Sequence, residues 1–400
     1  MDVRDTATGH ALDPMPYFKN IVADNVAPQM RQIALYPMPG AKVNGSTQPA
    51  YISPADKGGR IFTAWGNVIP GIKAYDRMTG TTNIYGVKHL SLRVDGHEVY
   101  RHTIDRVDLN RSRAINSMIC YPDKQRRGSW VMTSRIADND QLDYMRSAEN
   151  KGILNIDQER DYRCEWIMTD EHGNRATVPF TIRGQRTAVS PDKPRGTLFR
   201  HNRPSHVSGY GLDARFPADI FYNDFYFNTT YRNDSSYHSR VYTVGDETVP
   251  LAGNYTLTID LTSDDIADKS KYCMVRINGK SKSALTSTYT DGHVSASPNC
   301  FGIYAVTIDT IAPAVTPVSM KNWGKNGTVS YRLTDNLSGI NRYYGTIDGE
   351  FVLFELDGKT ARASYKLEPE RVKRGQNHTI TMTATDACGN TTTVTDRFYW

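Results

Sequence analysis

Thr385-Asp386-Ala387-Cys388-Gly389-Asn390 leads into an alternating segment that contains Thr393 and Val394. The same order of residue types occurs earlier, where Thr169-Asp170-Glu171-His172-Gly173-Asn174 leads into Thr177-Val178-Pro179-Phe180. Asp, Gly and Asn tolerate the positive φ angles of tight turns, and alternating Thr and Val are typical of half-buried strands. Each stretch therefore predicts a turn between two antiparallel strands.

The two turns belong to a longer internal repeat. In the first copy, Asp76-Arg77-Met78-Thr79-Gly80 precedes the alternating run His89-Leu90-Ser91-Leu92-Arg93-Val94 and the pair Asp95-Gly96. In the second copy, Asp335-Asn336-Leu337-Ser338-Gly339 precedes Ile347-Asp348-Gly349. We interpret each copy as a small antiparallel sandwich. The first copy carries an extra stretch near residues 107–152, which we interpret as an insertion where added function often lies.

Length and composition place this repeat in an all-β chain. The 400 residues suggest about two to four domains, and 24 tyrosines with many threonines and valines favour strands. We predict tandem immunoglobulin-like β-sandwich modules. The predicted division is a first sandwich at 17–186, a linker at 187–195, a second sandwich at 196–311 and a C-terminal immunoglobulin-like sandwich at 312–400.

Charge and hydropathy argue against several classes of protein. Hydrophobic residues make up 38% and charged residues 23%, a balance that permits buried cores and argues against disorder and against a membrane protein. We predict no transmembrane segment, and the N-terminus shows no secretion signal. A diffuse net charge of +5 does not predict nucleic-acid binding, although it would not oppose docking on an anionic cell wall. We interpret Lys124, Arg126 and Arg127 as solvated loop charge.

The five cysteines do not form a metal or redox motif, because none stands in a Cys-x-x-Cys arrangement. An odd number cannot pair completely. Bridges between Cys120 and Cys164 and between Cys273 and Cys300 are plausible, and buried free thiols are equally compatible with the sequence.

The order of the motifs resembles secreted Bacteroidetes proteins in which a LytM-type (lysostaphin-family) zinc metallopeptidase domain precedes immunoglobulin-like modules. The resemblance rests on Tyr85-Gly86-Val87, on Arg113-Ala114-Ile115-Asn116, on Asn150-Lys151-Gly152-Ile153-Leu154 and on the turn that begins at Asp170. It covers nearly all of the chain. It implies that residues 1–16 are a remnant of the end of the peptidase domain.

The chain departs from this family at the metal site, which needs a His, an Asp four residues later and a downstream His-x-His pair. The ten histidines are His10, His89, His97, His102, His172, His201, His206, His238, His293 and His378. No two are separated by one residue, and His10 and His102 each precede an aspartate by three residues rather than four. We therefore assign no catalytic or metal-binding residue, and the resemblance implies zinc only for an upstream domain.

Two functions follow as expectations. The first is an accessory, non-catalytic region of a secreted peptidoglycan-directed zinc metalloendopeptidase, whose partners would be peptidoglycan or the upstream peptidase domain. The alternative is a non-enzymatic cell-surface binding or adhesive protein that recognises a glycan, peptidoglycan or a protein. Either would be periplasmic, secreted or at the cell surface if the full-length protein has a signal peptide. The sequence assigns no binding residue.

Several polar clusters have simpler explanations than chemistry. The paired carboxylates are Asp264 with Asp265, Asp157 with Glu159, and Glu368 with Glu370. We interpret them as solvated charges, because glycoside hydrolysis needs two carboxylates that face each other across a cleft. Asp335, Asn336, Ser338 and Asp386 offer oxygen ligands suited to calcium, but turn capping explains them more simply.

Two further segments, a histidine-containing loop and an aromatic run, could bind a ligand or be purely structural. The segment that contains His201 and His206 could be a metal pair, an inter-domain contact or an exposed loop, and composition favours the exposed loop. The aromatic residues Tyr222, Phe225, Tyr226, Phe227 and Tyr231 could stack on sugar rings, but packing in a sandwich core, with tyrosine tips in water on the other face, is the favoured interpretation.

Overall fold

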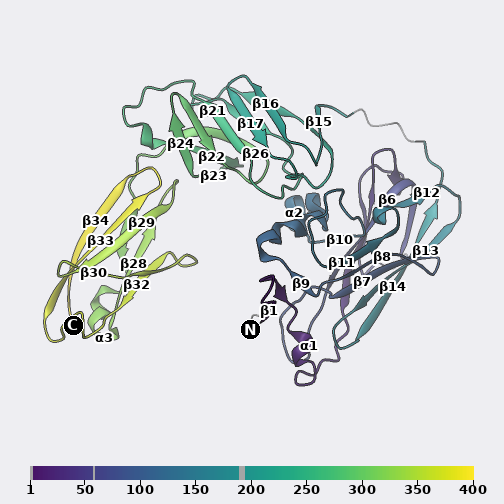
Figure 1. Cartoon of the computed structure of the whole chain (residues 1–400), viewed down its shortest axis with the longest axis horizontal. Coiled ribbons are helices and arrows are strands. Elements are labelled where there is room, and N and C mark those ends of the chain that lie inside the picture. The colour runs from purple at the N-terminus through teal and green to yellow at the C-terminus, as the bar shows by residue number, and fades with distance from the viewer. Residues whose placement is uncertain (1–2, 57–58, 189–193) are drawn as a thin grey trace. The chain divides into compact units, whose positions relative to one another are not determined.

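The computed structural model describes residues 3–56, 59–188 and 194–400. The chain divides into two compact units, and the elements of each are labelled in Figure 1. The first unit comprises Met1–Ser205, Pro217–Asn228 and Asp246–Gly253, and the second comprises His206–Phe216, Thr229–Gly245 and Asn254–Trp400. The regular structure is nearly all strand, which confirms the predicted all-β fold of tandem immunoglobulin-like sandwiches. The predicted linker 187–195 lies largely on residues 189–193, outside the described residues.

The main sheet of the first unit is folded into two layers that share one long strand, β6 (Ile61–Tyr75). The first part of β6 pairs in parallel with β14, and its second part pairs antiparallel with β3. Gly66, at φ +90°, stands where β6 passes between the layers, because a glycine tolerates this conformation. The other strands are β3 (Gln29–Pro37), β4 (Lys42–Val43), β5 (Ala50–Ile52), β7 (His89–Val94), β8 (His97–Thr103), β10 (Met132–Thr133), β11 (Met145–Ala148), β12 (Leu154–Ile156), β13 (Asp161–Thr169) and β14 (Arg175–Gly184).

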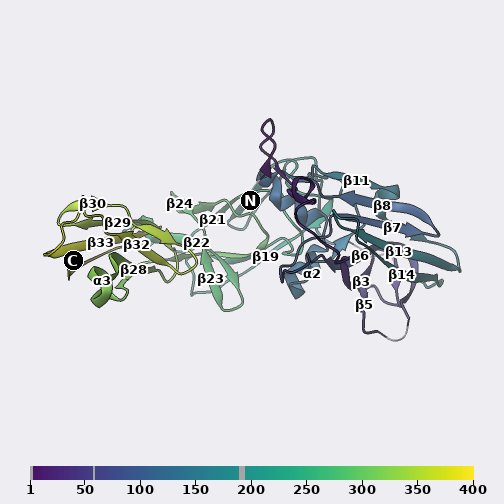
Figure 2. The same cartoon turned by 90° about the horizontal axis from the view of Figure 1, so that it is seen from below.

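The core of this sandwich lies between the layers. In β13, alternate residues point inward, so that Tyr162, Cys164, Trp166 and Met168 are all buried. Strands β8, β7, β13 and β14 run side by side in Figure 2. Burial of each large apolar side chain contributes about 2 kcal/mol to stability.

The rest of the first unit surrounds the sandwich. A small sheet contains β1 (Val3–Arg4), β2 (Ala11–Leu12) and β9 (Arg106–Val107). Helices are short: α1 (Met15–Phe18), α2 (Tyr121–Arg127) and the 3-10 helices Leu109–Ser117 and Glu149–Gly152. The strands β15 (Thr197–Phe199) and β18 (Phe225–Phe227) pair with each other.

The second unit contains two sandwiches. The first has two five-stranded sheets. One sheet contains, in order, β16 (Ser205–Gly209), β17 (Leu212–Phe216), β21 (Thr256–Asp260), β25 (His293–Ala296) and β24 (Ser287–Thr290). The other contains β19 (Thr229–Arg232), β20 (Val241–Val244), β26 (Gly302–Ile308), β22 (Tyr272–Asn278) and β23 (Ser281–Ala284). A 3-10 helix, Lys269–Lys271, precedes β22.

The second of these sandwiches is the C-terminal one, with two four-stranded sheets. They contain β27 (Ala314–Pro317), β28 (Thr328–Thr334), β32 (Arg362–Lys366) and β31 (Glu355–Asp357), and β30 (Glu350–Val352), β29 (Ile340–Ile347), β33 (Asn377–Asp386) and β34 (Thr391–Tyr399). A 3-10 helix, Met320–Asn322, leads into α3 (Trp323–Asn326). The residues packed between the sheets include Trp323, Tyr331, Phe354 and Phe398.

All five cysteines are free thiols, so neither plausible bridge is present. Cys164 points into the core of the first sandwich, whereas Cys120 packs with a separate cluster beside Tyr36 and Val131. The thiol of Cys273 instead lies beside that of Cys388 in a core cluster of the second unit. Within the described residues, no helix is both long and apolar enough to cross a membrane.

Candidate functional site

One cleft of the first unit is lined by three segments that are far apart in the sequence. It has a volume of about 700 Å³ and lies between the sheet residues Tyr36 and Tyr51, the helix α2 and the segment around Tyr222. We call it the insertion cleft. Its polar and aromatic lining residues are Tyr36, Gln48, Tyr51, Asn116, Ser117, Tyr121, Asp123, Arg126, Arg127, Thr133, Arg135, Tyr222, Asn223, Phe225 and Thr248.

Helix α2 corrects the prediction that Lys124, Arg126 and Arg127 are loop charges. Pro122 stands in the first turn, where its missing N–H costs nothing, and Gly128 ends the helix in the left-handed conformation at φ +60°. The basic residues occupy the last turn, where they complement the helix dipole. The short sequence has no repeated apolar spacing, so periodicity did not reveal this helix.

A buried carboxylate anchors α2 to the sheet. The hydroxyl groups of Tyr36 and Tyr51 both donate to Asp123, each at 2.7 Å. Burial and the neighbouring carboxylate raise the pKa of both tyrosines well above their ordinary value, so both remain donors. Asp123 is the acidic residue in the cleft lining, and its two oxygens are already occupied.

Arginines supply the positive charge of the cleft. The guanidinium of Arg127 lies 4.2 Å from the ring centroid of Tyr51, and its side chain is 48% exposed. Arg135 donates to the amide oxygen of Asn223 at 2.8 Å, and burial lowers its pKa. Arg126 is exposed on α2. Guanidinium groups beside aromatic faces can bind a carboxylate through paired hydrogen bonds.

The predicted aromatic run divides between core and surface. Tyr222 is 1% exposed, and its hydroxyl donates a hydrogen bond to the carbonyl of Arg113. Phe227 is also buried. Phe225 lines the insertion cleft, while Tyr226 and Tyr231 are exposed. The packing interpretation is therefore right for Tyr222 and Phe227.

Two groups of side chains within the described residues offer three potential metal ligands close together. We call Asp24, Asp76 and Asp170, with His172, the first acidic corner, and Asp309, Asp335 and Asp386 the second acidic corner. The candidate ligand atoms of Asp24, Asp170 and His172 lie within 4.8 Å of one another. The same holds for those of Asp309, Asp335 and Asp386. Oxygen ligands of this kind could hold a hard cation such as calcium.

Turn chemistry already engages these carboxylates, as the sequence suggested. Asp335 accepts from the amides of Leu337 and Gly339, and Asp386 accepts from those of Cys388 and Asn390. The same pattern holds in the first corner, where Asp170 accepts from Asn174. The calcium alternative stays a prediction.

The remaining histidine and carboxylate candidates have separate partners. His201 pairs with Asp224 and His206 with Asp213, each at 2.7 Å. His10 pairs with Asp143 at 2.9 Å, while His102 is fully buried, which lowers its pKa to about 3. Of the carboxylates, Asp264 accepts from Tyr289, Glu368 pairs with Arg371 and Asp157 accepts from Asn155. Apart from the buried His102, these groups make separate local pairs and do not form one shared site.

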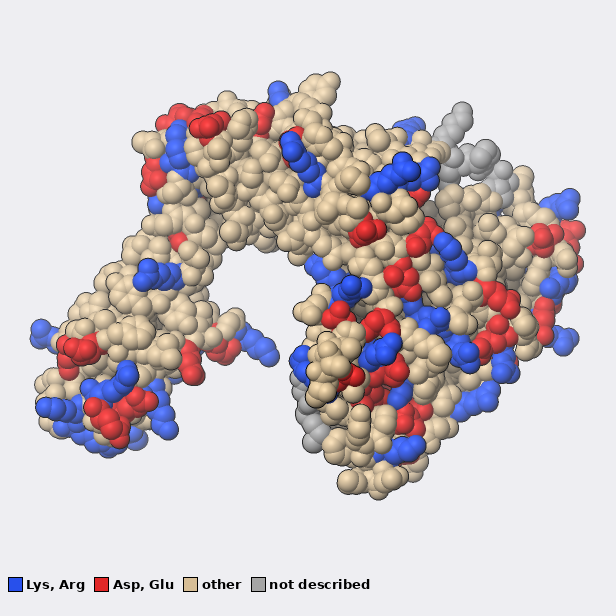
Figure 3. Space-filling model, in the orientation of Figure 1, with Lys and Arg blue, Asp and Glu red and all other residues tan. Residues whose placement is uncertain are grey.

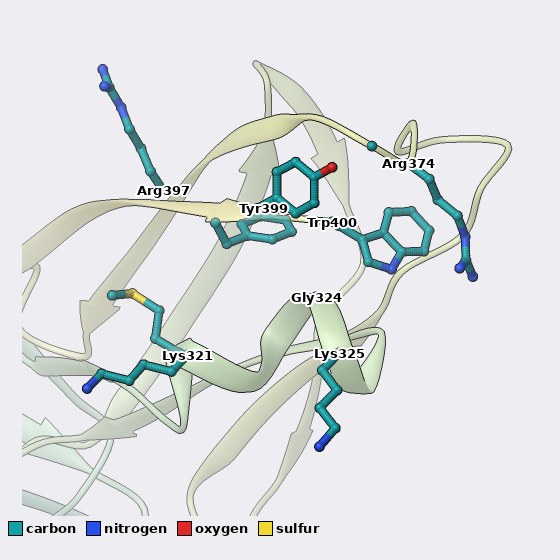
Figure 4. Close-up of a pocket in the computed structure, with 10 residues that line it drawn as sticks. Lys321, Gly324, Lys325, Arg374, Arg397, Tyr399 and Trp400 are labelled. Atoms are coloured by element: carbon teal, nitrogen blue, oxygen red, sulfur yellow. The ribbon is translucent and has the colours of Figure 1, made fainter.

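A second basic pocket lies at the end of the C-terminal sandwich, with a volume of about 660 Å³. Lys321 and Lys325 come from the helical side, while Arg397, Tyr399 and Trp400 come from the strand side (Figure 4). The charged ends of Lys321, Lys325 and Arg397 extend in different directions in this view. This pocket is therefore a weaker anion site than the insertion cleft.

Acidic and basic side chains are intermixed on the visible face of the first unit (Figure 3). The insertion cleft was missed from the sequence because its residues come from distant segments. The one local signal was the concentration of Arg and Asn in the insertion.

The sequence profile of the Zu5-like domain matches residues 196–309. No curated protein matches the chain. Among solved structures, the chain is similar to a 1.5-MDa bacterial ice-binding adhesin, with 12% identity over 94% of this chain and 97% of that chain and a TM-score of 0.17. It is also similar to the fibronectin(III)-like modules of Clostridium thermocellum CbhA, with 7% identity over 90% and 93% and a TM-score of 0.16. A third is Bacteroides ovatus SGBP-B in complex with a mixed-linkage heptasaccharide, with 10% identity over 83% and 63% and a TM-score of 0.14. Scores this low carry no argument about function.

Proposed function

We propose that the chain is a non-enzymatic binding protein of the cell surface that holds a carboxylate-bearing glycan in the insertion cleft. The observation that carries the proposal is the lining of this cleft. Arg126, Arg127 and Arg135 face a space of about 700 Å³ beside aromatic rings, and the acid of the lining, Asp123, is engaged by two tyrosines. The cleft thus offers charge for a carboxylate and ring faces for a sugar.

Peptidoglycan is the first ligand to test, because its lactyl and peptide carboxylates meet this requirement. Purified sacculi are incubated with the chain, sedimented and assayed for bound protein. We expect retention above that of an unrelated control protein, and a decline with added salt because salt screens exposed charges. Absence of retention would count against peptidoglycan as the ligand.

The site itself is tested by substitution. Arg126→Ala and Arg127→Ala each remove a guanidinium and leave the two tyrosine hydroxyls bonded to Asp123, although Arg127→Ala also removes the ion pair of Arg127 with Asp123 at 4.0 Å. Together the two substitutions should weaken binding at least about tenfold. Arg203→Ala is the matched control, because this exposed arginine lies in the first unit and outside the cleft. Equal binding by the double variant and the control would overturn the assignment.

The resemblance to a region that follows a LytM-type peptidase stays a separate prediction. Intact-mass measurement of the native protein in its source cells tests it. A longer species that contains the missing His-x-x-x-Asp and His-x-His pattern would support it, and a species that starts at Met1 would contradict it.

A further inference from the structure

The hairpin between β16 and β17 places a tyrosine where a different residue is expected. Its two central residues are Tyr210 and Gly211, with φ angles of +54° and +83°. Positive φ at both positions defines a type I′ turn, in which Asn-Gly is strongly preferred. A tyrosine in the left-handed region is strained, so the turn alone does not account for Tyr210.

Two hydrogen bonds hold Tyr210 in this strained conformation. Its carbonyl oxygen accepts from the guanidinium of Arg240 and from the hydroxyl of Tyr242, both at 2.7 Å. Glycine is favoured at position 211 by its φ of +83°, and an added Cβ there would stand only 3.0 Å from the same hydroxyl. The fold therefore fixes the backbone of Tyr210 while its side chain stays 73% exposed.

The exposed ring forms a surface with a second tyrosine. The ring centroids of Tyr210 and Tyr231 are 5.3 Å apart, with the planes tilted by 36°, and Tyr231 is 44% exposed. Arg240 also lies 5.1 Å from the ring centroid of Tyr231, so one arginine supports both residues. The two rings are thereby held in place before any ligand arrives.

The rings border a groove of about 450 Å³ that contains no charged residue. Ser208, Thr229 and Thr230, which carry hydroxyl groups, belong to its lining, and the hydroxyl of Thr229 donates to the carbonyl of Thr243 at 2.9 Å. An uncharged groove matches an uncharged ligand, and the combination of ring faces with hydroxyl groups suits the C–H face and the hydroxyls of a sugar.

We propose that Tyr210 and Tyr231 form a stacking site for a neutral saccharide. The site belongs to the second unit and is independent of the proposed carboxylate-binding cleft. It gives a role to Tyr231, which the aromatic run of the sequence singled out. It also accounts for the strained tyrosine, because the left-handed backbone is what presents this ring beside Tyr231.

The decisive variant is Tyr210→Asn, which replaces the tyrosine with the residue that the turn prefers. The full chain is applied to an array of neutral oligosaccharides, with Pro-rich peptides printed beside them as the alternative occupants of an aromatic groove. We expect the wild type to bind a neutral oligosaccharide, and Tyr210→Asn to lose at least about tenfold in affinity while its thermal midpoint stays equal or rises. Tyr231→Ala should lose binding as well.

Tyr344→Ala is the matched control, because Tyr344 is exposed on another sandwich of the same unit, outside the groove. Unchanged oligosaccharide binding by Tyr210→Asn would overturn the proposal, as would binding of peptides alone or of no printed saccharide. Arg126→Ala with Arg127→Ala should leave this binding intact, so failure here and failure of the insertion cleft are distinguishable.

Discussion

The two acidic corners share one hydrogen-bond pattern but differ in their surroundings. In the first, the amide group of Asn174 donates to Asp170 at 2.8 Å and to the carbonyl of Asp24 at 3.1 Å. In the second, Asn390 donates to Asp386 at 2.7 Å and to the carbonyl of Asp309 at 3.0 Å. The repeat therefore preserves the way in which its last hairpin is tied to the segment that enters the sandwich.

The surroundings diverge at the position two residues after the capping aspartate. His172 stands there in the first copy and borders a cavity of about 520 Å³, whose lining also includes Asp76 and Lys88. Cys388 stands there in the second copy and is buried beside Cys273, and its carbonyl accepts from Lys271 at 2.9 Å. The same turn thus borders an open pocket in one copy and a closed contact in the other. The turn residues determine the backbone geometry, whereas the neighbouring residues determine whether the corner is open or closed.

The largest expected effect is a difference in stability between substitutions of the equivalent asparagines, Asn390 and Asn174, in the two corners. Asn390→Ala removes the donor to one carboxylate oxygen of Asp386 and to the backbone carbonyl of Asp309, two residues that are both 1% exposed, and should lower the free energy of unfolding by about 3 kcal/mol. Asn174→Ala removes the same two bonds beside a cavity that admits water, and should cost about 1 kcal/mol. Hydrogen exchange in urea, read separately for each sandwich, measures both losses. Equal losses would mean that the cavity does not solvate the first corner.

The second effect is a pH dependence of the first corner. Burial, and then the carboxylates of Asp170 and Asp24, raise the pKa of Asp76 to about 6. The folded state then holds a proton that the unfolded chain, with a pKa near 4, releases. The stability of the first sandwich should therefore fall by about 2 kcal/mol as pH rises from about 4 to above 6.

Asp76→Asn keeps the shape and removes this titration. Its sandwich should show a flatter stability profile between about pH 4 and 6 than the wild type. The C-terminal sandwich of the same chain is the internal control. A wild-type profile that is already flat in this window contradicts the assignment.

The third effect is the rate of thiol alkylation, which tests whether the second corner stays closed to solvent. Cys388 and Cys273 are 3% and 2% exposed, whereas Cys300 is partly exposed. A hydrogen bond with the Cys388 thiol, and then burial, raise the pKa of Cys273, which further lowers its reactivity. The same hydrogen bond lowers the pKa of Cys388, so the slow reaction expected of Cys388 rests on its burial. We expect alkylation of these two thiols in the native protein to be at least about tenfold slower than that of Cys300, as followed by peptide mass spectrometry. Equal rates would show that the corner opens readily, and labelling in urea gives the reference rates.

The smallest effect concerns a contact in the first corner. The hydroxyl of Thr79 lies 3.0 Å from Asp24 and 2.8 Å from Asn25. Because the site is exposed, Thr79→Val should cost only about 0.5–1 kcal/mol. Thr81→Val, whose hydroxyl lies 3.4 Å from the carbonyl of Met78, is the control and should change less. A larger loss would indicate that the first corner depends on Asp24 more than on Asn174.

The sequence predicted what is local in these corners. The turns at Asp170 and Asp386 follow from residue types within a few positions, and both have the expected capping bonds. Their partners Asp24 and Asp309 were missed, although each begins the pattern Asp-x-Val/Ile-Ala-Pro, at 24–28 and 309–313. A comparison of the repeat that started earlier in each copy could have found them.

Long-range pairing explains what the sequence did not show. Tyr51, Arg127 and Phe225 of the insertion cleft lie far apart in the chain, and nothing in their local context indicates a shared surface. The choice between core and surface for the aromatic run depends on which strand covers each residue, so Tyr222 and Tyr231 could not be separated beforehand. Cys273 and Cys388 likewise meet only because two sandwiches of the second unit touch.

The shared strand β6 also sets an order of events during synthesis. Ile61 pairs with Thr181, a partner that leaves the ribosome long after it, whereas β33 and β34 of the C-terminal sandwich are neighbours in the chain. Contacts between distant residues require a large loop to close first and are formed slowly. The first sandwich should thus remain open, with the unpaired edge of β6 exposed, until β14 emerges, and this nascent stage is where the chain most needs protection from aggregation.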